Sequence, residues 1–182
     1  MKSLIDHLSQ YAAYHRDRRN IATHFVGIPM IVLAVAMLLS RPVLAMAGDV
    51  AITPALAVVL ATAVFYLRLD VRFALFMTAF LLVCLWLGQR IAAAPTAVWL
   101  GWGVGLFVIG WVFQFVGHYY EGRKPAFVDD LVGLIVGPLF VAAEAAFAMG
   151  LRKEVQSAIE ARVGPTLIRP PKAASMADAT RQ

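Results

Sequence analysis

Histidine is the residue type in this sequence best suited to chemistry, and three of the four histidines stand beside other polar residues at the ends of apolar stretches. His15 and His24 form the first group, together with Asn20. The two histidines are nine positions apart, so an unbroken helix would point them to opposite sides. Both can reach one metal ion only if the helix is interrupted between them, and Asn20 or Thr23 as the N-cap of the following helix would supply that break.

The second group lies at the end of a later apolar stretch, where Gln114, His118 and Glu121 follow one another at steps of four and three residues. On a helix these steps place the three side chains on one face. A histidine with a carboxylate one turn away can bind a metal together with it, or the carboxylate can orient the imidazole from behind. A plainer reading stays open for both groups, in which the histidines are only interfacial polar residues.

A third polar feature is Glu144, which stands alone in the apolar run from Pro138 to Met149. An ionised and unpaired carboxylate at such a position would cost several kcal/mol. We therefore expect Glu144 to be neutral, paired, or turned toward a polar cavity inside the protein.

The composition indicates which elements must position these groups. Hydrophobic residues make up 61% of the 182 residues and charged residues 15%, with a mean hydropathy of +0.75, whereas soluble domains carry about 25% charged residues. Apolar stretches long enough to cross roughly 25 to 30 Å of hydrocarbon can be counted, at residues 21–40, 50–67, 71–87, 97–117 and 131–151. The sequence therefore predicts an all-α, multi-pass membrane bundle of four to five transmembrane helices, with an even count favoured.

The second and third stretches are separated only by residues 68–70, so they form a tight hairpin or one of them crosses incompletely. We expect a single membrane domain in three segments. Residues 1–20 form an amphipathic interfacial helix, residues 21–151 the transmembrane bundle with the metal site, and residues 152–182 a basic and largely flexible segment.

Basic residues flank the apolar stretches, and the formal net charge is +5. They form no stripe interleaved with aromatic residues, which argues against a nucleic-acid partner. Arg16, Arg18 and Arg19 are interpreted as charges flanking the first span, and their distribution favours a cytoplasmic N-terminus. The start of the first span and the end of the fourth then share one membrane face, so the two histidine groups can meet.

Other kinds of site find little support. The single cysteine, Cys84, excludes an internal disulfide framework and a cysteine-based zinc site. The glycines at 101, 103 and 105 lie within an apolar helix and follow no strand, so they are not a dinucleotide fingerprint. We expect no organic cofactor.

Ordered motifs run through the first 150 residues. They read Tyr11-x-x-Tyr14-His15, Asn20-x-x-x-His24-x-x-Gly27-x-Pro29, Gln114-x-x-Gly117-His118 with Pro125-Ala126, and Pro138-Leu139-Phe140-x-x-x-Glu144. With these motifs the chain resembles the Mpo-like membrane proteins, a family that includes a fungal endoplasmic-reticulum Fe(II)-dependent 2-hydroxy fatty acid dioxygenase. The resemblance covers about residues 1–150.

The resemblance implies α-oxidation, in which O2 and a ferrous ion convert a 2-hydroxy fatty acid to the acid one carbon shorter. It implies His24 and His118 as iron ligands with His15 as the third. Glu121 or Glu144 would complete or orient the ligand shell, Asn20 and Gln114 would hydrogen-bond to the ligands, and Arg123 with Lys124 would meet the substrate carboxylate. The implied partners are a lipid-derived 2-hydroxy fatty acid, O2 and membrane lipids. The implied location is the inner membrane of a bacterium or the endoplasmic reticulum of a eukaryote. The oligomeric state, a homodimer included, stays open.

Two other functions stay open. A small transporter or proton relay would use Glu144 as its titrating group and the histidines as a shuttle, although inverted repeats are not visible. A non-catalytic membrane scaffold would carry the histidines as interfacial residues only.

Overall fold

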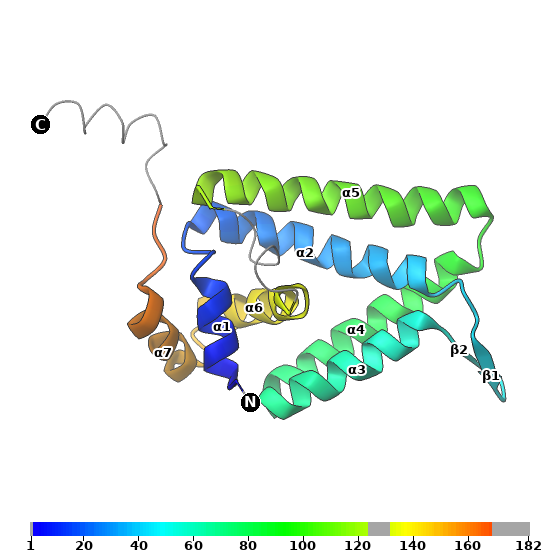
Figure 1. Ribbon diagram of the computed structural model, residues 1–182, viewed down its shortest axis with the longest axis horizontal. Helices are drawn as coiled ribbons and strands as arrows, with labels where there is room; N and C mark the ends of the chain where they lie inside the picture. The colour runs from blue at the N-terminus through cyan, green and yellow to red at the C-terminus, as the bar shows by residue number, and fades with distance from the viewer. Residues whose placement is uncertain (1, 124–131, 169–182) are drawn as a thin grey trace, which may run out of the picture. The chain divides into compact units, whose positions relative to one another are not determined.

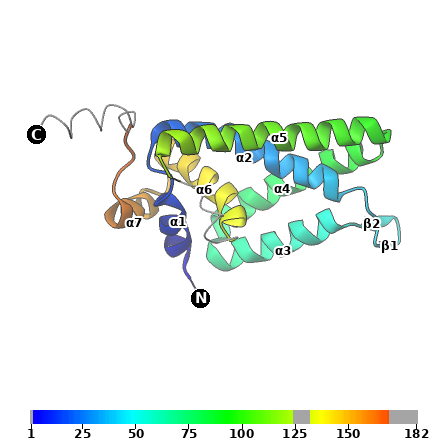
Figure 2. The same cartoon turned by 45° about the horizontal axis from the view of Figure 1, so that its top comes forward.

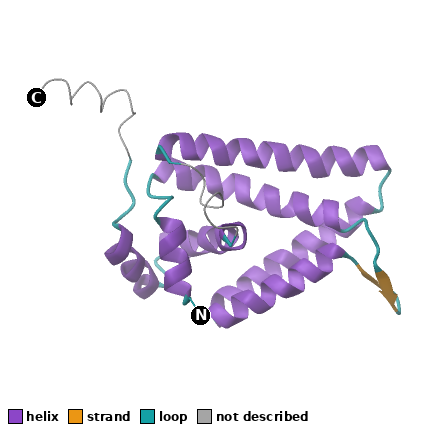
Figure 3. Cartoon of the chain, in the orientation of Figure 1, coloured by secondary structure: helices purple, strands orange, loops and turns teal. Residues whose placement is uncertain are grey.

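The computed structural model describes residues 2–123 and 132–168, and within them the chain is mostly helical with one short β-hairpin (Figure 3). The elements in chain order are α1 (Leu4–Ala12), α2 (Arg18–Leu39), β1 (Ala45–Ala47), β2 (Val50–Ile52), α3 (Pro54–Leu69), α4 (Val71–Ala92), α5 (Thr96–Glu121), α6 (Gly133–Ala148) and α7 (Lys153–Val163). The predicted helical membrane fold is confirmed, and the antiparallel hairpin of β1 and β2 is an addition to it.

Three of the described helices, α2, α4 and α5, are long and apolar enough to cross a membrane. The pair α6 and α7 passes the same test when taken together and is bent by 113°, as a broken span or a re-entrant loop would be. Length and composition therefore allow three spans, or four with the bent pair, which is the lower end of the predicted range.

The predicted tight turn between the second and third apolar stretches is present, and α3 and α4 pack side by side (Figure 1). Asp70 serves both helices. Its backbone N–H donates to the Tyr66 carbonyl at the end of α3, and its side chain accepts from the Phe73 N–H at the start of α4. With 16 residues, α3 is the shorter of the pair, which agrees with an incomplete crossing.

The chain divides into two compact parts, and the division falls inside α2 and inside α5. The first part comprises residues 26–112. Here α2 and α5 approach closely at Gly110, where an added Cβ would lie 2.9 Å from the carbonyl oxygen of Gly27. Only glycine permits this contact between a helix backbone and its neighbour.

The second part comprises residues 4–25 and the described residues from 113 onward. In it α1 packs against α6 and α7 (Figure 2). Leu8, Ala12, Leu139, Phe140 and Ala143 are fully buried and form the apolar core of this part. All the predicted site residues that the structure describes lie here.

The segment predicted as one helix over residues 1–20 is interrupted. Helix α1 ends at Ala12 and α2 begins at Arg18, so residues 13–17 form a turn and a short loop. The break that the two histidines require is therefore present, but the residue that caps α2 is Asp17, whose Oδ1 accepts from the Arg19 N–H at 2.9 Å. Asn20 and Thr23, the predicted caps, lie inside α2.

The segment predicted to be largely flexible, residues 152–182, contains a further helix. Residues 153–163 form helix α7, which buries Val155 and Ile159, and residues 164–168 continue from it. The rest of that segment, residues 169–182, lies outside the described residues.

Candidate metal centre

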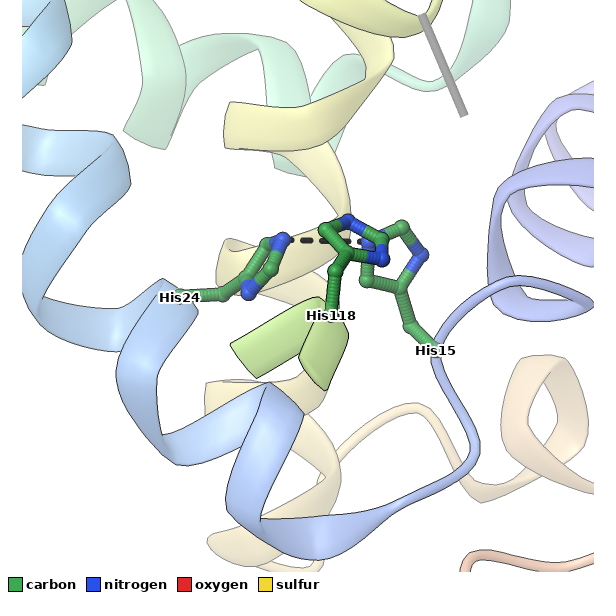
Figure 4. A group of neighbouring side chains, drawn as sticks. All are labelled: His15, His24 and His118. Carbon is green, nitrogen blue, oxygen red and sulfur yellow. Dashed lines mark hydrogen bonds between the residues drawn. The ribbon is translucent and has the colours of Figure 1, made fainter. Parts of the chain in front are cut away.

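Three histidines converge in the second part of the chain (Figure 4). His15 comes from the loop between α1 and α2, His24 from the start of α2, and His118 from the last turn of α5. One ring nitrogen of each lies within 4.8 Å of those of the other two, and all three side chains are buried. The predicted meeting of the two polar groups therefore takes place.

Backbone carbonyls fix two of the three rings from behind. His15 Nδ1 donates to the Tyr11 carbonyl at 2.7 Å, and His24 Nδ1 donates to the Asn20 carbonyl at 2.8 Å. Because a carbonyl oxygen only accepts, the proton of each neutral ring sits on Nδ1 and the lone pair on Nε2. The two Nε2 atoms face each other at 3.0 Å.

Two lone pairs at this distance repel unless a cation lies between them. A proton is disfavoured because burial first, and the neighbouring His24 second, hold the pKa of His15 well below its usual value. A metal ion fits better. Imidazole nitrogens bind first-row metals at about 2.1 Å, and two such ligands on one ion lie on the order of 3 Å apart. A buried group of neutral imidazoles therefore suits iron, zinc or copper.

The loop that carries His15 is held by Glu121, which is 1% exposed. Its Oε2 accepts from the backbone N–H groups of Arg16 at 2.9 Å and Asp17 at 2.8 Å, and from Asn20 Nδ2 at 3.1 Å. The ring of Tyr11 stacks on His15 with centroids 4.1 Å apart and planes 3° apart. The His15 imidazole is thus fixed on its face, at its Nδ1 and through its main chain.

Gly117 sets the contact between α2 and α5 beside the histidines. A Cβ at this position would overlap Thr23 Oγ1 and Asn20 Oδ1. Since His118 follows directly and His24 lies one turn from Asn20, the glycine lets the two rings approach each other.

Glu121, Asn20 and Gln114, the predicted supporting residues, differ in what they bind. Glu121 Oε2 is bound to the loop, and Asn20 bonds to Glu121 and to the Tyr14 carbonyl through its side chain. Asn20 orients His24 through its main-chain carbonyl. Gln114 is buried, and its Nε2 has no hydrogen-bond partner among residues 2–123 and 132–168. Its predicted bond to a ligand stays a prediction.

Glu144 is paired, which is one of the three states expected for it. Its Oε1 lies 3.5 Å from Arg16 Nη2, and the Arg16 side chain is 6% exposed. Arg16 still stands just before the spanning helix α2, but its buried side chain is not free to contact lipid headgroups. Burial lowers the pKa of Arg16, an effect that Glu144 opposes. Sequence reasoning missed this pair because its members are far apart in the chain.

The predicted substrate contacts are only partly described. Arg123 is exposed, and its Nη1 donates to the Ala13 carbonyl at 3.0 Å, two residues before His15. Lys124 lies outside the described residues.

A buried cluster of three imidazoles in a bundle of apolar helices defines a membrane protein with a candidate metal centre. The family model described as 2-hydroxy-palmitic acid dioxygenase Mpo1-like matches residues 1–149. The chain is also 30% identical over 164 residues to the 2-hydroxy-palmitic acid dioxygenase MPO1 of Saccharomyces cerevisiae. This match covers 87% of this chain and 90% of the yeast protein. The chain belongs to the Mpo1-like family, so the resemblance found in the sequence is confirmed. No solved structure matches it.

Proposed function

We propose that this chain is a membrane-embedded, Fe(II)-dependent dioxygenase that converts a 2-hydroxy fatty acid to the fatty acid one carbon shorter. The observation that carries the proposal is the buried convergence of His15, His24 and His118, with two Nε2 lone pairs directed at each other. The activity in the name of the yeast relative supports the choice of substrate class.

The residues present suit such a reaction. Ferrous iron held by the three imidazoles would supply the redox chemistry that lets O2 react with an organic acid. Atoms balance if the lost carbon leaves as carbon dioxide together with one water. The tautomers fixed by the Tyr11 and Asn20 carbonyls keep the Nε2 atoms of His15 and His24 available as ligands. The burial of the cluster limits the access of water to the reacting groups.

The substrate also suits the surroundings of the cluster. Its hydroxyl and carboxylate oxygens form a chelating pair, and its acyl chain matches the apolar helices of a membrane bundle. We assign Arg123 as the contact for the carboxylate, because its bond to Ala13 keeps it beside the loop that carries His15. The transporter hypothesis loses its main support, since Glu144 is in an ion pair with Arg16.

The test is metal and oxygen analysis of protein purified without air. We expect the wild-type chain to retain about one iron per chain and to consume O2 with 2-hydroxyhexadecanoate but not with hexadecanoate. His118→Ala should lose both iron and O2 consumption. His7→Ala is the matched control, because His7 is the one histidine outside the cluster. A wild-type protein without iron, or a His118→Ala protein with full activity, would overturn the proposal.

A further inference from the structure

The segment that follows α7 lies against the loop that carries His15. Residues 164–168, here called the strap, form a parallel β-bridge in which Asp17 pairs with Leu167. The Leu167 N–H donates to the Arg16 carbonyl at 2.9 Å, and the Arg18 N–H donates to the Leu167 carbonyl at 2.9 Å. The backbone of one strap residue, Leu167, thus binds the main chain on both sides of Asp17.

Side chains reinforce this pairing. Arg16 Nη1 donates to the Gly164 carbonyl at 3.0 Å, and Arg18 Nε donates to Thr166 Oγ1 at 3.4 Å. Just before the strap, Arg162 Nη1 lies 2.7 Å from Asp6 Oδ1 on α1. The strap and the end of α7 are therefore held to the first eighteen residues by backbone and side-chain hydrogen bonds and by an ion pair.

The loop depends on partners outside itself. The N–H groups of Arg16 and Asp17 bind Glu121, whereas the Arg16 carbonyl and the Arg18 N–H bind Leu167. A loop whose backbone groups are satisfied by distant residues takes the conformation that those residues impose. His15 directly precedes this stretch, so the position of its ring depends on both attachments.

We propose that the strap is a positioning element of the metal centre, with Leu167 as the positioning residue that acts on His15 through the loop main chain. The proposal rests on the proposed function in that His15 binds the metal. It assigns a role to a segment that lies beyond the residues matched by the family model, 1–149. Leu167 is 44% exposed, so the residue acts through its backbone N–H and carbonyl and not through core packing.

Two substitutions at position 167 separate these contributions. Leu167→Pro removes the N–H that donates to the Arg16 carbonyl, whereas Leu167→Ala keeps the N–H and removes only the exposed side chain. Co²⁺ is the probe for the full-length chain in detergent, because its visible absorption reports its ligands without any turnover. Thermal unfolding of each variant reports whether the chain is folded.

We expect Leu167→Pro to weaken Co²⁺ binding by about 10- to 100-fold, the usual effect of losing a group that orients a ligand, and to change the Co²⁺ absorption spectrum. Leu167→Ala should bind Co²⁺ within about twofold of wild type. If Leu167→Pro does not fold, a Gly-Gly insertion after Gly164, which keeps every native side chain and shifts the strap, should give the same loss.

A folded Leu167→Pro or insertion variant with wild-type affinity and spectrum would overturn the inference, as would an equal loss in Leu167→Ala. These outcomes are distinct from failure of the proposed function. In that case the wild-type chain itself would bind neither Co²⁺ nor iron, and His15→Ala would not differ from it.

Discussion

Replacement of Glu121 tests how the fold holds the His15 loop. The carboxylate oxygen Oε2 accepts three hydrogen bonds, from the N–H groups of Arg16 and Asp17 and from Asn20 Nδ2. Glu121 is 1% exposed, so its three donors are shielded from bulk water. Glu121→Ala would leave these three donors buried without their acceptor.

The structure allows the cost to be estimated. A buried donor that loses its partner costs about 1–3 kcal/mol. Because the three donors share one acceptor and the space left by the side chain admits some water, we expect the lower limit for each, about 3 kcal/mol in total. Glu121→Gln keeps an acceptor oxygen but loses the charge, so it should cost about 1–2 kcal/mol. Both variants should also bind metal more weakly, with Glu121→Ala affected more.

The assay is chemical unfolding in detergent micelles, followed by tryptophan fluorescence, together with Co²⁺ titration of the folded protein. Glu154→Ala is the matched control, because the Glu154 side chain is 68% exposed, and it should change stability by less than about 0.5 kcal/mol. A Glu121→Ala protein that equals this control in stability and keeps wild-type metal affinity would refute the reasoning.

Three further predictions concern the histidine cluster. Gly117→Ala should weaken Co²⁺ binding at least about tenfold, because the added Cβ would push α2 away from α5 beside His24. Gly105→Ala is the control, since nothing lies within 4 Å of a Cβ added there, and it should leave the Co²⁺ titration unchanged. Burial holds the pKa of His15 below its ordinary value of 6.5. As the pH falls, His15 is therefore protonated in the unfolded chain before it is protonated in the folded chain. The metal-free protein should therefore lose stability below about pH 6.5, and unfolding from pH 8 to 5 should show a smaller loss in His15→Gln. Metal at 100 times its dissociation constant should stabilise the wild-type chain by about 2.7 kcal/mol in unfolding assays, and a chelator should reverse this; an equal shift in His118→Ala would contradict the site.

Much of the site could be predicted because its residues are unusual where they stand. Imidazoles beside apolar stretches indicate a function, and the distribution of basic residues predicts that His24 and His118 share one membrane face. The helices follow from their apolar length. These predictions use only local composition and helical periodicity, both of which can be read from the sequence.

The break before α2 was predicted in the wrong place for a physical reason. Residues 13–17 contain no glycine or proline that would end α1, and the Asp17 cap of α2 is a local signal that the prediction passed over. The loop is fixed by Glu121 and Leu167, both more than a hundred residues away. A single sequence does not reveal such bonds.

Helix α7 was missed although a signal for it exists. Val155 and Ile159 are four residues apart and buried, which is the spacing of one helical face. The prolines and small polar residues that follow suggested flexibility, but composition cannot show that the backbone N–H and carbonyl of residue 167 bond to residues 16 and 18.

The arrangement of the histidines also bears on what the centre binds. The Nδ1 bonds to the Tyr11 and Asn20 carbonyls hold the rings of His15 and His24 with their Nε2 lone pairs opposed. Burial makes protonation of His15 costly, so a proton relieves this repulsion poorly. Glu121 Oε2 is bound to the loop and Glu144 Oε1 lies beside Arg16, so these two carboxylate oxygens already have partners in the protein. A metal bound by these neutral nitrogen atoms would be a transition metal and not calcium or magnesium, which prefer oxygen.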